Sequence, residues 1–309
     1  MPDNSVRQGV IYAIAAYLMW GIAPIYFHAI TEVPADEILM HRVFWSFWLV
    51  LMMVKVGGQM GQIRALMAQP KKLGILALTS VLIAGNWLIF IWAVTNGHVL
   101  DASLGYYINP LLNVALGLLV LGERPTRVQW AAVIIAAIGV LVQLVQFGSV
   151  PWISLALAGS FGAYGLLRKQ VNLQATTGLL METALLLPLA LVYWFWLDSP
   201  TANFGNNTMS LNLLLIAAGV VTTLPLLAFA GAAVRIPFYL LGMLQYIGPS
   251  VMLLLALTLF GESMAPGQIW TFGFIWAALL LLSLDALNRA RQHRRARRQT
   301  RSGTIDSTS

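Results

Sequence analysis

The chain is organised as long apolar runs separated by short polar breaks. Each run is close to the length of about 20 residues that a membrane-spanning helix needs. The runs cover residues 9–29, 35–55, 73–95, 99–121, 128–146, 151–169, 177–197, 211–234, 236–260 and 268–288. They are continuously apolar rather than alternating, which favours helices over barrel strands. The pattern therefore predicts an all-α membrane protein with ten transmembrane helices.

Composition supports a lipid-facing surface. Charged residues make up 9% of the chain and the AVILMFWYC set 59%, whereas soluble domains are about 25% charged. So few polar residues cannot cover a water-facing surface. The chain has no cysteine, which excludes disulfides, thiol nucleophiles and thiolate metal sites. The first run, Gly9 to Ile30, is too long for a signal-peptide core and is expected to be retained.

Basic residues predict the orientation of the chain. With the N-terminus inside, seventeen of the 18 lysines and arginines fall in inner loops or at inner helix ends. Cytoplasmic loops of membrane proteins carry this excess. Adding or removing one helix would reverse every later loop and destroy the bias. We therefore expect both termini to be cytoplasmic, with Arg42 as the exception inside the second run.

A motif recurs at a fixed distance along the chain. Tyr107-Ile108-Asn109-Pro110 and the later Gly122-Glu123 match Tyr246-Ile247-Gly248-Pro249 and Gly261-Glu262 at an offset of 139 residues. The match predicts two copies of a five-helix unit. Because five is odd, the second copy must enter the membrane from the opposite side. Inverted repeats of this kind are typical of secondary transporters, which bind solute near the midplane.

The repeat divides the chain into three parts. Residues 1–146 form the first repeat, residues 147–288 the second, and residues 289–309 a basic cytoplasmic tail. The tail carries seven arginines directly after the last helix. Such a cluster is expected to bind anionic lipids rather than nucleic acid, and to be otherwise disordered.

The chain resembles the EamA-type drug/metabolite transporter superfamily, and closely its RarD subfamily. The matching stretches are Arg7-Gln8-Gly9, Trp20-Gly21-Ile22-Ala23-Pro24, Val33 to Leu39, His41-Arg42, Gly85-Asn86-Trp87, Ala102 to Tyr106, Leu121 to Arg124 and Gln245 to Pro249. The resemblance implies a multi-pass carrier of the bacterial inner membrane. It also implies that helices 1 to 4 and 6 to 9 surround a central cavity, with helices 5 and 10 peripheral.

Ionisable residues within the apolar runs are candidates for gating or proton-linked roles, because charges are costly in hydrocarbon. Glu37 and His41 share one stripe of the second helix, and Arg42 points roughly 140° away from Glu37, towards an interfacial or interhelical ion pair. Snorkelling and helix-start capping are the alternatives. Glu182 aligns with His41 under the repeat. It is expected to take part in the transport cycle, or else to form a static salt bridge with a nearby basic residue, Arg168 or Lys169.

Polar and aromatic stripes on several helices outline an amphiphilic cavity. The substrate-cavity candidates are Trp20, Glu37, His41, Asn86, Trp87, Phe90, Tyr106, Asn109, Asn113, Tyr164, Glu182, Gln245 and Tyr246. Small and polar residues also pack membrane helices tightly, so each stripe alone fits packing as well as ligand binding.

The sequence favours a transporter over other classes. The four histidines lack metal-ligand spacing, and there is no nucleophile–base set and no phosphate-binding glycine loop. We therefore expect no catalytic residues, no metal, no cofactor and no enzyme activity. The predicted function is secondary transport, as an exporter, of a small amphiphilic metabolite or drug by alternating access. A channel-like facilitator and a flippase of a lipid-linked molecule are the alternatives, and a homodimer is compatible with the sequence.

Overall fold

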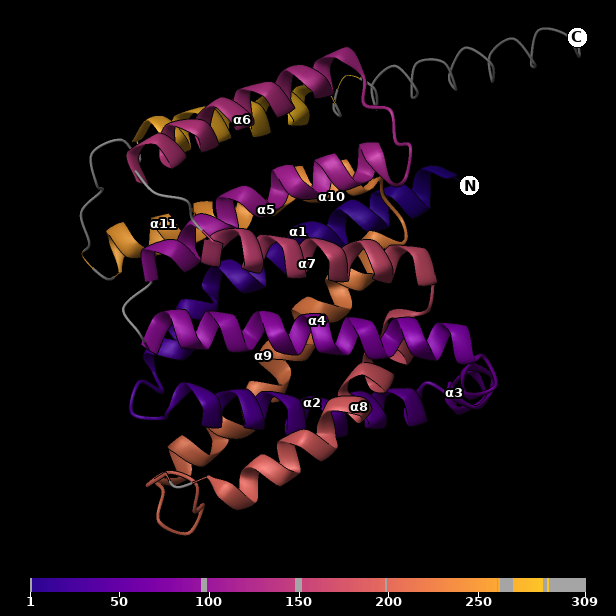
Figure 1. Ribbon diagram of the computed structural model, residues 1–309, viewed down its shortest axis with the longest axis vertical. Helices are drawn as coiled ribbons and strands as arrows, with labels where there is room; N and C mark the ends of the chain where they lie inside the picture. The colour runs from indigo at the N-terminus through magenta and orange to yellow at the C-terminus, as the bar shows by residue number, and fades with distance from the viewer. Residues whose placement is uncertain are drawn as a thin grey trace, which may run out of the picture. The chain divides into compact units, whose positions relative to one another are not determined.

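The computed structural model describes residues 2–95, 99–147, 152–197, 199–259, 261, 269–285 and 288. Within these residues the chain is helical, with no strand (Figure 1). The helices are α1 (Pro2–His28), α2 (Ala35–Val56), α3 (Met60–Met67), α4 (Pro70–Thr95), α5 (Val99–Leu119), α6 (Arg127–Phe147), α7 (Trp152–Val171), α8 (Ala175–Trp196), α9 (Met209–Ala233), α10 (Phe238–Gln245) and α11 (Ile247–Thr258). A further helix covers Ile269–Asp285. The basic tail lies outside the described residues.

Among the described residues, seven segments are long and apolar enough to cross a membrane. They are Asn4–His28, Ala35–Val56, Pro70–Phe90, Arg127–Val145, Ala175–Trp196, Met209–Ala233 and Phe238–Thr258. Leu104–Leu119 and Ile269–Asp285 are apolar but shorter. The helix α7 is not one of these segments. It is 20 residues long and carries Arg168 and Lys169 in its last turn. The prediction of an all-helical protein with multiple apolar spans is confirmed.

Two local features differ from the predicted runs. The short α3 occupies a segment that the sequence assigned to a connection. The run predicted over 236–260 is broken into α10 and α11 at Tyr246. Pro249 has no N–H to donate to the carbonyl of Gln245, four residues earlier, so the helix loses a bond at this point. Discontinuous helices of this kind line solute sites in transporters.

The chain divides into two compact units, residues 1–123 with 149–263, and residues 124–148 with 264–309. In the second unit, α6 packs against the helix Ile269–Asp285. Thr271 donates its hydroxyl to Gln143 Oε1 at 3.2 Å. A side chain on Gly139 would meet Phe274 Cβ at 3.0 Å, so the two helices approach closely.

The packing within the first unit has a regular pattern. α5 packs on α7, and α10 and α11 pack on α1; α4 packs on α7, and α9 packs on α1 (Figure 1). In the same way, α2 packs on α9 and α4 on α8, while α2 and α8 contact each other. Glycines permit the closest approaches. A Cβ on Gly242 of α10 would lie 2.6 Å from the carbonyl oxygen of Pro110 in α5.

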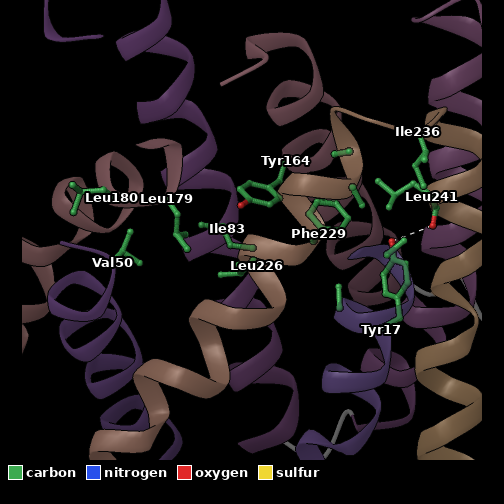
Figure 2. Packing of buried hydrophobic residues seen from close by; sticks show 14 of the residues in the cluster. Tyr17, Val50, Ile83, Tyr164, Leu179, Leu180, Leu226, Phe229, Ile236 and Leu241 are labelled. Carbon is green, nitrogen blue, oxygen red and sulfur yellow. Dashed lines mark hydrogen bonds between the residues drawn. The ribbon is translucent and has the colours of Figure 1, made fainter. Parts of the chain in front are cut away.

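A core cluster of buried side chains crosses the first unit. Figure 2 shows it running from Leu180 and Val50 past Tyr164 and Phe229 to Leu241. The rings of Tyr164 and Phe229 stack with centroids 6.2 Å apart. By contrast, large apolar side chains on the outer surface are almost fully exposed, such as Leu119 at 85% and Phe195 at 87%. That surface is suited to lipid rather than water.

Candidate functional site

A cavity of about 870 Å³ lies within the first unit. Its size suits a small organic molecule. Side chains from α1, α2, α4, α5, α7, α9, α10 and α11 contribute to its wall. The lining residues are Tyr17, Trp20, Ala23, Pro24, Phe27, His28, Thr31, Ala35, Ile38, Arg42, Ile83, Asn86, Trp87, Phe90, Gly105, Tyr106, Asn109, Leu157, Phe161, Leu226, Gln245, Gly248, Pro249 and Met252.

The cavity occupies only one end of the helices. On α1 its lining residues fall between Tyr17 and His28, and on α2 between Ala35 and Arg42. These are the last part of one helix and the first part of the next, so they lie at the same end. The other half of α2, including the fully buried Val50, belongs to the core cluster. Packed side chains therefore close the cavity at one end.

Polar contacts reinforce the closed end. Glu123 accepts hydrogen bonds from the backbone N–H groups of Phe238 at 2.7 Å and Tyr239 at 3.0 Å, at the start of α10. Lys169 lies 3.7 Å from the same carboxylate and donates to the carbonyl of Ala233, at the end of α9, at 3.0 Å. A carboxylate at a helix start and a lysine at a helix end complement the two helix dipoles. These contacts connect the end of α5 to α7, α9 and α10.

An amide network forms part of the cavity wall. Asn109 donates to the carbonyl of Ala158 at 2.9 Å, and Asn113 donates to Asn109 Oδ1 at 3.0 Å and to Gln245 Oε1 at 2.9 Å. The network joins α5 to α7 and to the last residue of α10. Asn109 and Gln245 reach the cavity, whereas Asn113 stands behind them. These side chains are therefore held in place while two of them are available to a solute.

The remaining wall is largely aromatic. Trp20 contacts Phe161 with ring centroids 5.8 Å apart, and Phe90 contacts Tyr106 at 6.4 Å. Asn86 also lines the cavity and donates to the carbonyl of Leu157 at 2.9 Å. Flat aromatic faces with a few fixed polar groups suit an amphiphilic molecule.

Arg42 is the prominent cavity residue that the sequence analysis did not place there. Its Nε donates to Thr222 Oγ1 at 2.8 Å, and its guanidinium carbon lies 4.6 Å from the ring centroid of Trp87. No described carboxylate lies within salt-bridge distance of it. The signal was present in the sequence, because Arg42 was the one basic residue outside the inner loops and helix ends. Of the roles that the sequence leaves open for Arg42, the ion pair has no described partner, and the neighbours of the guanidinium are the hydroxyl of Thr222 and the ring of Trp87.

The other face of α2 carries Glu37 and His41, away from the cavity lining. Glu37 accepts hydrogen bonds from the hydroxyl groups of Ser199 at 2.5 Å and Thr201 at 2.6 Å. His41 Nε2 lies 3.7 Å from Glu37 Oε1, and the imidazole ring packs against Trp194 at 5.2 Å. Both side chains are fully buried. They join α2 to the end of α8 and the connection that follows it.

Glu182 is held in a second buried polar cluster. Its Oε1 accepts from the hydroxyl of Thr79 at 2.6 Å and lies 3.7 Å from Arg168 Nε. Its Oε2 accepts from the hydroxyl of Tyr164 at 3.4 Å. Of the two interpretations offered by the sequence, this geometry matches the ion pair with Arg168. Glu182 and Tyr164 do not line the large cavity, although both border a small void of about 10 Å³ beside Arg42.

The sequence-derived candidates thus fall into two sets. Seven line the cavity: Trp20, Asn86, Trp87, Phe90, Tyr106, Asn109 and Gln245. Six lie outside its lining: Glu37, His41, Asn113, Tyr164, Glu182 and Tyr246. The cavity divides two of the predicted groups, because Asn109 lines it and Asn113 does not, and Gln245 lines it and Tyr246 does not. Among the described residues, no group of three or more His, Asp or Glu side chains is placed to hold a metal ion.

Comparison with known proteins agrees with this architecture. A profile of the EamA-like transporter family matches residues 7–145. Protein RarD of Salmonella typhimurium is 56% identical over 93% of this chain and 98% of its own length. Protein RarD of Escherichia coli K12 is 54% identical over 93% and 97%. An uncharacterized transporter of Vibrio cholerae serotype O1 is 54% identical over 96% and 99%. A solved crystal structure superposes with a TM-score of 0.68 over 90% of this chain and 98% of its own, at 16% identity, which supports the fold alone.

The apolar helical spans, together with the family match and relatives that are named transporters, indicate a multi-pass membrane protein of the transporter class. The chain belongs to the EamA-like transporter family, in its RarD subfamily.

Proposed function

We propose that this protein is a secondary transporter that exports a small amphiphilic molecule across the bacterial inner membrane by alternating access. The observation that carries the proposal is the one-ended cavity. A wide, aromatic and amide-lined space reaches the middle of the helices and stops at a packed core. An open pathway through the protein would favour a channel, whereas a cavity closed at one end favours a carrier.

The proposal includes ten transmembrane helices in two inverted repeats, residues 1–146 and 147–288, with both termini cytoplasmic. The packing pattern supports it. If α1, α2, α4 and α5 are exchanged for α7, α8, α9 and α10 with α11, the main packings map onto one another. The packing of α5 on α7 becomes that of α10 and α11 on α1, α4 on α7 becomes α9 on α1, and α2 on α9 becomes α8 on α4, while the contact of α2 with α8 maps onto itself. Gly122 and Gly261, at equivalent repeat positions, both adopt a positive φ, +63° and +66°. Equivalent turns after equivalent helices are what a repeat requires.

Alternating access predicts that the two ends of the cavity open in turn. The cysteine-free chain permits a direct test with Thr31→Cys, in the cavity, and Val50→Cys, in the closed core. A bulky maleimide should label the cysteine at position 31 readily. It should label the one at position 50 slowly, because that position is exposed only when the opposite end opens. In the double variant, prior labelling at position 31 should slow labelling at position 50.

The control pairs Val50→Cys with Asn203→Cys, an exposed loop position outside the cavity. Labelling at position 203 should leave the rate at position 50 unchanged. Equal and independent labelling at positions 31 and 50 would favour the channel and remove alternating access. The exported solute can be sought by comparing metabolites in the medium of cells with and without the protein.

A further inference from the structure

Arg42 is a cation in the cavity wall, and no described carboxylate lies within salt-bridge distance of it. It lies seven residues after the start of α2, about 10 Å along the helix at 1.5 Å per residue. A charge at such a depth in hydrocarbon is costly and usually faces a cavity or a partner. The described lining residues include no aspartate or glutamate, and Arg42 is their one lysine or arginine. The cavity is therefore positively charged.

The neighbours of Arg42 orient it rather than neutralise it. Thr222 of α9 accepts a hydrogen bond from Nε, which fixes the plane of the guanidinium. Trp87 of α4 lies against it at 4.6 Å, and Phe27 is more distant at 6.0 Å. Aromatic faces attract a cation but leave its N–H donors unused. The described contacts leave both Nη groups for a ligand.

The buried carboxylate that borders the same small void as Arg42 is already engaged. Glu182 borders the same small void as Arg42, but it pairs with Arg168 and accepts from Thr79. It forms no described ion pair with Arg42. An internal carboxylate therefore does not explain why a guanidinium is retained at this position.

We propose that Arg42 binds the carboxylate of an organic acid with an apolar body, so that the transported solute is an amphiphilic monoanion. The inference rests on the proposed transporter function and names its substrate class. A guanidinium presents a planar fork of donors that matches a carboxylate. A single cation compensates a single negative charge, which favours a monoanion. Trp20, Phe90 and Phe161 provide the apolar wall for the rest of the molecule.

The test measures binding of three compounds of one shape and different charge to the full chain in nanodiscs. The compounds are 3-phenylpropanoate, its neutral amide 3-phenylpropanamide, and the cation 3-phenylpropylamine. We expect the anion to bind roughly tenfold more tightly than the amide, or better, because bonds to a charged group are stronger. The amine should bind most weakly, since it is repelled by Arg42. A preference for the amide or the amine, or no binding of the anion, overturns the proposal.

Variants then attribute the preference to Arg42. Arg42→Gln should abolish the difference between anion and amide, and Arg42→Lys should retain a reduced preference because the charge remains without the fork. Arg64→Gln, which removes an exposed arginine on α3, is the matched control and should retain the full preference. Retention of the preference in Arg42→Gln would overturn the assignment. If Arg42→Gln does not fold, the wild-type series and the reduced preference expected in Arg42→Lys still test the proposal, and an undiminished preference in Arg42→Lys would overturn the assignment.

Transport is measured separately, by exchange of labelled 3-phenylpropanoate in proteoliposomes. Selective binding that depends on Arg42, without exchange, would contradict the transporter function and leave the anion site standing. Exchange of the amide or the amine in preference to the anion would support the transporter function and overturn the anion site.

Discussion

Tyr246 donates a hydrogen bond from its phenol to the backbone carbonyl of Tyr107, with 3.1 Å between the two oxygens. The two tyrosines are 139 residues apart and open the two copies of the Tyr-Ile-x-Pro motif. Contact between equivalent residues is expected close to a two-fold axis, where each position meets its own counterpart. The bond therefore joins the two proposed repeats at equivalent positions.

Replacement of Tyr246 by Phe should weaken this junction. The ring of Tyr246 is fully buried, so the change removes the hydroxyl and leaves the Tyr107 carbonyl without that donor. We expect a loss of about 1 kcal/mol in stability, measured as a lower unfolding temperature in detergent. Tyr12→Phe, at a ring that is 40% exposed, is the control. Equal unfolding temperatures for the two variants would show that the bond contributes nothing.

Gly178 leaves the space in which the Arg168 side chain lies. A methyl group at this position would overlap Arg168 Nη1. Gly178→Ala should therefore displace the guanidinium from Glu182 and destabilise the protein by about 1–3 kcal/mol, the range of core overpacking. Gly159→Ala, on α7 with open space around its Cβ, is the matched control. The unfolding temperatures of the two variants distinguish them. An unfolding temperature of Gly178→Ala equal to that of the unchanged protein would contradict the packing of Arg168 against Gly178.

The Glu182–Arg168 pair makes a prediction about two coupled substitutions. Both side chains are 2% exposed, so Glu182→Gln leaves a buried guanidinium without its counter-charge. Breaking a buried pair in this way costs about 3–5 kcal/mol. Adding Arg168→Gln should recover part of the loss, because neither charge then remains. The unfolding temperatures of the two single variants and the double variant give the coupling, and simple additivity would argue against an ion pair.

Glu123 makes a prediction about the closed end. Glu123→Ala removes the acceptor for two N–H groups at the start of α10, which should cost about 0.5–2 kcal/mol. Because these contacts close one end of the cavity, the cysteine of Val50→Cys should be labelled faster when Glu123→Ala is added than in its absence. Glu123→Gln keeps one acceptor oxygen, so its stability and its labelling rate should lie between those of the unchanged protein and Glu123→Ala. An unaltered labelling rate at position 50 in Glu123→Ala would show that Glu123 does not help to close the cavity.

Topology can be checked with fused reporters. A reporter after Asn203, in the connection between α8 and α9, should be external, and one after Gly58, between α2 and α3, should be cytoplasmic. A reporter after Arg291 should also be cytoplasmic. These outcomes follow from the distribution of basic residues. An internal signal at Asn203 would break both the ten-helix count and the inverted repeat.

The sequence by itself determined the all-helical membrane class, the approximate limits of the spans and the family. These follow from local information, because length and hydropathy define a span, and identity with relatives covers nearly the whole chain. The division of the predicted run 236–260 into α10 and α11 had to be seen in the structure.

Only the tertiary structure decided which face of each helix meets the cavity. A helical period fixes the angle between Glu37 and Arg42, but it does not fix the rotation of α2 against its neighbours. That rotation depends on packing, including the close approach of Gly219 in α9 to Trp45, where an added Cβ would lie 2.5 Å from the Trp45 Cβ. The packed helix presents Arg42 to the cavity and turns Glu37 towards Ser199. The partner of Glu182 was likewise settled by the distance between α7 and α8, a quantity that no sequence spacing contains.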